Sequence, residues 1–282
     1  MSTRTQAYEP YEGAKLERLE ADAAAILARY PEHPQSGLLP LLHLVQSEDG
    51  YVSPDGITFC ARTLGLSTAE VSAVATFYTQ YKRHPNGQYT VGVCTNTLCA
   101  VMGGDAIFDE LADHLGVGHD ETTEDGAITL ERIECNAACD YAPVMMVNWE
   151  FFDEQTPDSA IDVVDRLRAG EQVAPTRGAG SVCTFKQMSR VLAGFPDGRA
   201  DEGVGAGPAT LAGLRLAREK GWRAPAGPES AAAEDAATAE SPAARGTSGL
   251  TPGRGSSIDT PSAPPSGGSA DTDTGREPSE EA

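Results

Sequence analysis

The chain has 282 residues and a formal net charge of −21, and residues 1–170 carry 27 acidic and 10 basic side chains. Such an acidic chain repels nucleic acid and anionic lipid, and it suits a basic protein partner. Because no run of 18 apolar residues is present, we expect no direct membrane insertion. The first residues lack the apolar core of a secretory signal, so we expect a cytoplasmic protein.

Residues 1–85 are expected to form a helical bundle. In each predicted helix, apolar residues either recur at helical spacing or run almost continuously. Ser53 followed by Pro54 is typical of a helix start, and Ser67 with Glu70 forms a capping box. The expected helices span residues 14–30, 38–45, 54–64 and 67–79.

Two residues of this bundle carry reactive side chains. His43 lies alone in an apolar helix, where a histidine is more often a satisfied core residue than a metal ligand. Cys60 lies beside Phe59 on the third helix and is expected to be a small core residue. We therefore assign neither side chain to a functional site.

Residues 86–170 show a different periodicity, which predicts a second, α/β domain. Alternating apolar residues indicate strands, and apolar residues on one face indicate helices. The segment between the first helix and the second strand, residues 116–126, is polar and predicts a loop. The expected order is strand 88–93, helix 104–115, strands 128–134, 144–147 and 149–152, and helix 157–169.

Four cysteines follow the first two strands of this domain in two pairs, Cys94-x4-Cys99 and Cys135-x3-Cys139. In a reducing compartment, clustered cysteines are more often metal ligands or catalytic thiols than structural disulfides. A redox disulfide and a zinc half-site both favour a tighter C-x2-C spacing. A [2Fe–2S] cluster takes two thiolates on each iron and suits wider pairs. The spacing favours the cluster and leaves a structural zinc site open.

The C-terminal third divides into two parts. Residues 171–224 are expected to be a partly ordered linker with two apolar stripes, and Cys183 in the first stripe is given no role. Each stripe either docks on a partner or packs back on its own domain. Residues 225–282 hold Leu250 and Ile258 as their only large apolar residues, which predicts a disordered tail. The stripes are Val182, Phe185, Met188, Leu192 and Phe195, then Leu211, Leu214 and Trp222.

Several stretches between residues 35 and 170 together resemble one family: the [2Fe–2S] subunit of NADH–quinone oxidoreductase, which is respiratory complex I. The resemblance covers about half of the chain, with the motifs in the family's order and with its cysteine spacing. It implies a helical N-terminal part followed by a thioredoxin-like domain. The matching stretches are Gly37–Gln46, Leu66–Val71, Val74–Tyr78, Val93–Cys99 and Cys135–Val144.

The resemblance also implies the roles within the site. It implies that Cys94, Cys99, Cys135 and Cys139 hold one [2Fe–2S] cluster, and that no residue of this chain is catalytic. FMN and NADH are expected on a partner subunit, and the cluster would exchange single electrons with that flavin. The sequence agrees with this division, because it has no G-x-G-x-x-G after a strand and no phosphate-binding loop.

The setting that the resemblance implies is an NADH-oxidising, quinone-reducing translocase. The chain would lie at the cytoplasmic face of the membrane, among other subunits of the peripheral arm. Two alternatives stay open. One is an equivalent subunit of an NAD-linked hydrogenase or formate dehydrogenase. The other is a zinc-stabilised thioredoxin-like interaction module without a redox role.

The sequence departs from the family's usual pattern near the cysteines. Ala137 and Asp140 stand where glycines are common, and Leu98 precedes Cys99 where a proline is common. An ionised Asp140 beside the cluster would disfavour the reduced state and lower its potential. If the family's glycine has a positive φ there, Asp is one of the few residues that tolerates it.

Overall fold

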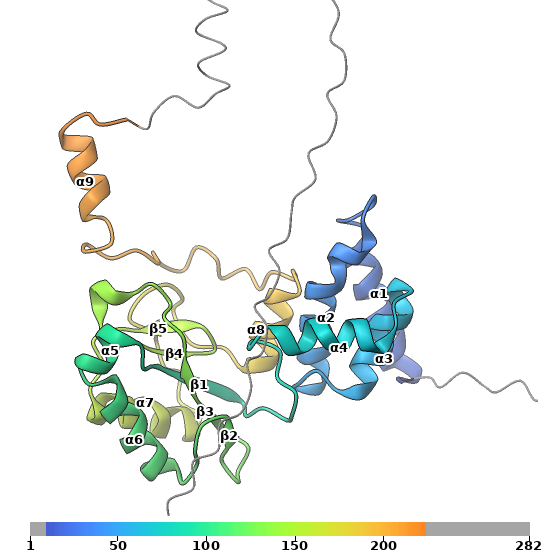
Figure 1. The fold of residues 1–282 in the computed structure, drawn as a ribbon, viewed down its shortest axis with the longest axis horizontal. Helices are drawn as coiled ribbons and strands as arrows, with labels where there is room; N and C mark the ends of the chain where they lie inside the picture. The colour runs from blue at the N-terminus through green and yellow to red at the C-terminus, as the bar shows by residue number, and fades with distance from the viewer. Residues whose placement is uncertain (1–9, 224–282) are drawn as a thin grey trace, which may run out of the picture. The chain divides into compact units, whose positions relative to one another are not determined.

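A computed structural model describes residues 10–223 (Figure 1). Its N-terminal part is helical, as the sequence predicts, and each expected helix is present within a few residues. The third and fourth helices begin at the predicted caps, where the Ser53 and Ser67 hydroxyls accept backbone N–H groups. The helices are α1 Gly13–Leu27, α2 Leu38–Asp49, α3 Pro54–Leu64 and α4 Thr68–Phe77, with a 3-10 turn at Pro34–Gly37.

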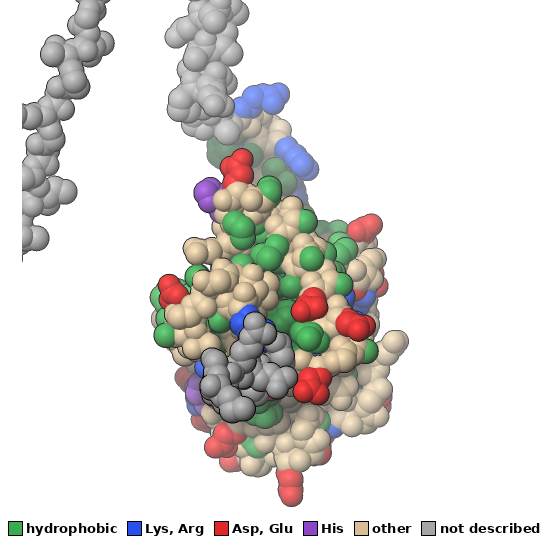
Figure 2. Space-filling view, turned by 90° about the vertical axis from the view of Figure 1, so that its right-hand side faces the viewer, with side chains coloured by type: hydrophobic (Ala, Val, Ile, Leu, Met, Phe, Trp, Pro, Cys, Tyr) green, Lys and Arg blue, Asp and Glu red, His purple; other side chains and the backbone are tan. Residues whose placement is uncertain are grey.

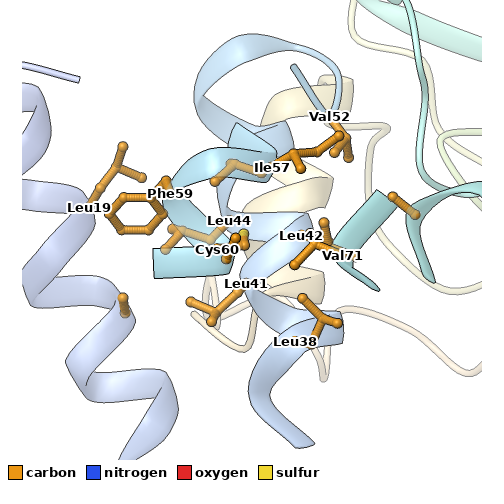
Figure 3. Close-up of a cluster of buried hydrophobic side chains, with 14 of the residues drawn as sticks. Leu19, Leu38, Leu41, Leu42, Leu44, Val52, Ile57, Phe59, Cys60 and Val71 are labelled. Atoms are coloured by element: carbon orange, nitrogen blue, oxygen red, sulfur yellow. The ribbon is translucent and has the colours of Figure 1, made fainter. Parts of the chain in front are cut away.

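Helix α2 lies at the centre of this part. It is apolar almost all round, and its leucines are covered by α1 on one side and by α3 on another (Figure 3). Cys60 is completely buried in the same core, which confirms its predicted place. Acidic side chains are scattered over the face shown in Figure 2.

A five-stranded sheet follows. The strands are β1 Tyr89–Cys94, β2 Glu121–Thr122, β3 Ile128–Ile133, β4 Met145–Val147 and β5 Glu150–Phe152, in the order β2-β3-β1-β4-β5. β1 and β3 are parallel, whereas the other neighbours are antiparallel. The expected loop over 116–126 is wrong in one detail, because β2 pairs there with β3. Two polar residues are too short a strand to show a period.

Helices α6 Gly104–Leu115 and α7 Pro157–Arg168 pack against each other, and their apolar residues join the strands in a second core. Arg132 of β3 holds α6 from outside this core. Its guanidinium lies 3.8 Å from the centre of the Phe108 ring and pairs with Asp105 and Asp109. Helix α6 is therefore fixed to the strand that precedes Cys135.

The first C-terminal stripe forms helix α8, Phe185–Leu192, which packs on α2 of the same chain. Phe185 is 1% exposed and lies beside Trp149 of the β4–β5 turn. Arg190 pairs with Asp22 of α1 at 2.7 Å. This stripe therefore packs on its own chain, which is the second of the two expected alternatives, and docking on a partner stays a prediction.

A buried polar junction joins the helical part to the sheet. Gln46 of α2 is fully buried and accepts the backbone N–H of Lys82 at 2.8 Å. It donates to Gln80 O and to the hydroxyl of Ser189 on α8. The Lys82 ammonium in turn pairs with Glu131 of β3, and both side chains are buried. Three segments distant in sequence thus meet at one glutamine.

Two further helices are short: α5 Thr97–Val101, which follows Cys94, and α9 Ala212–Glu219, which contributes no buried residue. Among residues 10–223, no helix is long and apolar enough to cross a membrane. The predicted disordered tail, 225–282, lies outside the described residues. The boundaries at residues 85, 170 and 224 stay a prediction.

Replacement of Phe185 by Ala should lower the free energy of unfolding by about 3–5 kcal/mol, because a fully buried aromatic ring leaves a cavity. Leu192→Ala on the same helix is the control, since Leu192 is 39% exposed and should cost less than about 1 kcal/mol. Urea unfolding of both variants measures the difference. Equal, small effects would show that α8 is not part of the folded core.

His43 should make the free energy of unfolding depend on pH. It is 8% exposed, burial lowers its pKa to about 4, and its Nδ1 has no hydrogen-bond partner within residues 10–223. It is thus a core residue as expected, but not a satisfied one. As the pH falls below about 6.5, the unfolded chain takes up a proton that the folded chain does not, so stability should fall by about 3 kcal/mol by pH 4.

His43→Phe keeps an aromatic ring without the titration, so its stability should fall less over the same pH range. Urea unfolding at a series of pH values compares the two proteins. Parallel curves for wild type and variant would contradict the lowered pKa of His43.

Candidate metal centre

The two cysteine loops leave the sheet at the same edge. β1 and β3 are parallel neighbours, and their register pairs Cys94 with Ile133, the last residue of β3. The C-terminal ends of both strands are therefore adjacent, where open α/β sheets place their sites. The four cysteines line one small cavity together with Asn136, Ala138 and Val144.

Within the cavity the thiols remain in two pairs. Cys135 Sγ and Cys139 Sγ are 3.5 Å apart, and the Cys94 thiol interacts with that of Cys99. Two thiolates on one tetrahedral metal at about 2.3 Å would lie roughly 3.7 Å apart, which matches such a pair. The donor set fits a two-metal cluster with one pair on each metal.

The pairs differ in exposure. Cys94 and Cys99 are buried, whereas Cys135 and Cys139 are exposed. Burial, together with the neighbouring thiols, raises the pKa of Cys94 to about 11. The adjacent Cys135 thiol raises the pKa of Cys139. Because the pKa values of Cys94 and Cys139 are raised, metal binding at these two thiols releases their protons and is driven by the positive charge of the metal.

Asn96 and Gly104 fix the first loop. The Asn96 side chain donates to Ile133 O at 3.3 Å and so links the ends of β1 and β3. The Asn96 backbone N–H donates to the Cys94 sulfur. Gly104 begins α6 directly against the loop, where an added Cβ would lie 2.4 Å from Cys94 O and 2.9 Å from Cys99 O. Only a residue without a side chain fits there.

The second loop turns at Ala137, which has a φ of +55°. This turn lets the Ala137 backbone N–H donate to Cys135 Sγ at 3.4 Å. Asp140 lies in the 3-10 turn Cys139–Tyr141 and is not among the residues with positive φ. Ala137 and Asp140 both stand where the family commonly has glycine. Only Ala137 has the left-handed backbone conformation, and Asp140 does not.

A C-terminal segment, residues 203–210, contacts the second cysteine loop. The Thr210 hydroxyl donates to the Asp140 carboxylate at 2.6 Å, and Ala209 N donates to the Tyr141 hydroxyl at 3.2 Å. A Cβ on Gly207 would lie 2.0 Å from the same hydroxyl oxygen. These contacts were not predicted from the sequence, because the small residues of segment 203–210 give no sign of which part of the fold the segment contacts.

The structure keeps the other candidates away from this cavity. Cys60 belongs to the helical core, and Cys183, also buried, does not line the cavity. His43 lies on α2 against the Tyr81 ring. The sequence-predicted four cysteines are thus the ones that the fold brings together.

Helices followed by a sheet with paired cysteine loops at one edge define an iron–sulfur electron carrier of thioredoxin-like fold. The model of the family described as "Thioredoxin-like [2Fe-2S] ferredoxin" matches residues 23–168, which is more than half of the chain. The chain belongs to this family. Its cofactor is one [2Fe–2S] cluster, and the zinc alternative is set aside.

Two NADH-quinone oxidoreductase subunits agree with this membership. The chain is 66% identical over 214 residues to the E subunit of NADH-quinone oxidoreductase from Mycobacterium tuberculosis, covering 76% of this chain and 84% of that protein. It is 36% identical over 148 residues to NADH-quinone oxidoreductase subunit 2 of Thermus thermophilus, covering 52% and 82%. A chain of an NAD+-reducing [NiFe]-hydrogenase matches with 19% identity and a TM-score of 0.44, over 48% of this chain and 23% of that one.

Gly104→Ala should lower the cluster content per chain, because the new methyl group displaces the loop that carries Cys94 and Cys99. Gly205→Ala is the control, since nothing lies within 4 Å of its Cβ position. Iron and sulfide analysis with visible absorption of both purified variants measures the effect, and circular dichroism checks folding. Full cluster content in a folded Gly104→Ala protein would contradict the close approach.

Proposed function

We propose that the chain is the electron-transfer subunit of an NADH–quinone oxidoreductase, with Cys94 and Cys99 as ligands of one iron and Cys135 and Cys139 as ligands of the other. The observation that carries the proposal is the convergence of these two thiol pairs on one cavity at the edge of the sheet. When bound there, a [2Fe–2S] cluster accepts and gives up one electron at a time.

The residues around the thiols support an electron carrier. The Asn96 and Ala137 amides donate to cysteine sulfurs, and such hydrogen bonds stabilise the added negative charge of a reduced site. Val144 and Ala138 are buried and exclude water from the inner side. The exposed Cys135 and Cys139 leave the outer side within reach of a redox partner.

The partner that fits is the flavin- and NADH-binding subunit of the same complex. Helix α5, Thr97–Val101, carries Cys99 on its buried side and presents apolar side chains to solvent. Exposed apolar side chains beside a redox site are typical of an interface. They are Leu98, Val101 and Met102, with exposed fractions of 44, 81 and 54%.

The proposed location follows from this partner. Within residues 10–223 the chain has no helix that could cross a membrane. We propose that the subunit lies in the peripheral arm, at the cytoplasmic face, in contact with other subunits of that arm, because its cluster must come close to the flavin of the proposed partner. The hydride chemistry of NADH and FMN belongs to the partner, and this chain takes the electrons singly.

Replacement of any one ligand cysteine by Ser should remove or shift the EPR signal of the dithionite-reduced protein, because a hydroxyl is a poorer iron ligand than a thiolate. Cys183→Ala is the matched control and should keep the wild-type signal, since Cys183 lies outside the cavity. A bleached Cys183→Ala protein, or a wild-type signal from Cys139→Ser, would contradict the ligand assignment.

A second experiment tests the partner. NADH should reduce the cluster of the purified chain only after addition of the flavin-bearing subunit, as followed by EPR. The control omits that subunit. Direct reduction by NADH alone, or reduction only with a hydrogenase flavoprotein, would contradict the proposed assignment.

A further inference from the structure

Helix α9 is folded but buries none of its residues against its own chain. An isolated helix of eight residues is marginal in water. Large apolar side chains in and beside it are exposed: Leu211 36%, Leu214 47%, Leu216 41% and Trp222 62%. The helical period places Leu211 and Leu214 one turn apart on the same side, whereas Leu216 lies on the other side.

The segment around α9 has a net positive charge, opposite in sign to the net charge of the whole chain. Residues 211–223 carry four basic side chains and one acidic one, in a protein whose net charge is −21. Arg215 and Arg218 follow Leu211 and Leu214 at helical spacing, on the side that carries these leucines. Among the described residues, no ion pair is found for either arginine. Trp and Arg are the residue types that contribute most to protein–protein binding.

The start of α9 is fixed beside the cluster loop. Thr210, two residues before the helix, donates to Asp140, and Asp140 follows the proposed ligand Cys139 directly. Arg177 strengthens this anchor, because it donates to Gly205 O at 3.0 Å and lies over the Phe151 ring at 4.0 Å. Whatever α9 binds is therefore held next to the exposed cysteines.

We propose that α9 is a docking helix that binds an acidic surface with an apolar groove on the flavin-bearing subunit. This inference rests on the proposed function, because the partner that must approach the cluster is the one that exchanges electrons with it. Leu211, Leu214 and, just beyond the helix, Trp222 contact the groove. Arg215 and Arg218 pair with carboxylates at its rim. The acidic body and the basic helix together fix one orientation of the complex, since charges of both signs must be matched.

The short length of α9 and its position beside the redox site favour a protein surface over a lipid surface as its binding partner. An interfacial helix binds lipid through a large apolar face, whereas the leucine side of α9 holds two leucines followed by arginines. The eight residues of α9 make about two turns, which is short for a helix that lies in a membrane surface. The anchor on Asp140 also fixes α9 to the redox site, which lipid binding does not require.

The test is titration of the purified flavin-bearing subunit with the full-length, cluster-containing chain, measured by calorimetry at several salt concentrations. Arg218→Glu and Trp222→Ala should each weaken binding by about tenfold or more. The loss for Arg218→Glu should shrink as salt rises. The EPR signal of both variants should match that of wild type, because neither residue lines the cysteine cavity.

Arg18→Glu is the charge-matched control, since Arg18 is an exposed side chain on α1. It should leave the affinity within about twofold of wild type. Equal affinities for wild type, Arg218→Glu and Trp222→Ala would overturn the docking role of α9 while leaving the proposed function intact. Failure of the wild-type chain to bind the flavin-bearing subunit would instead overturn the proposed function.

Sedimentation with vesicles of phosphatidylglycerol and phosphatidylcholine in equal parts separates the lipid alternative. The wild-type chain should stay in the supernatant. Binding to these vesicles that is lost in Arg218→Glu would overturn the proposal and assign α9 to an anionic membrane surface.

Discussion

The parallel pairing of β1 with β3 is the constraint on which the site depends. Each cysteine pair follows one of these strands, and the register that aligns Cys94 with Ile133 brings both loops to the same edge. A shift of β3 by one residue would turn its core side chains to the opposite face. The burial of Ile128 and Leu130 therefore specifies the register, and the register specifies where four thiols meet. The packing of the hydrophobic core therefore determines where the four thiols lie.

The rest of the chain holds that pair of strands in place. Gly92 of β1 lies so close to Ile133 that any side chain there would collide with it. From the helical side, Gln46 fixes the backbone at Lys82, and Lys82 neutralises the buried Glu131 of β3. The C-terminal segment contacts the second cysteine loop through Thr210 and Asp140. The helical part and the C-terminal segment thus both support the strands and loops that carry the proposed ligands, without supplying a ligand of their own.

Much of this was predictable from sequence, for physical reasons. Helix caps and apolar periodicity are local signals, so the helices and the main strands were found. The four cysteines were singled out by their paired spacing, and the fold brings them to one cavity. Family resemblance supplied the cluster, and ligation by these four thiols stays a prediction.

Three features were not predictable. β2 is too short to show a period, the burial of Phe185 depends on a partner helix distant in sequence, and the contact of Thr210 with Asp140 spans 70 residues. In each case the deciding interaction is tertiary. The prediction for His43 failed differently, because its burial was foreseen but its unpaired Nδ1 was not.

The central claim is that two cysteine pairs hold two irons, one pair on each. X-ray absorption at the iron edge of the purified full-length chain tests it most directly, because the fine structure reports the ligand atoms and the metal–metal contact together. We expect sulfur as the only ligand type of iron, with one short iron–iron contact. Nitrogen or oxygen among the ligands, an isolated iron without a metal neighbour, or zinc in place of iron would contradict it.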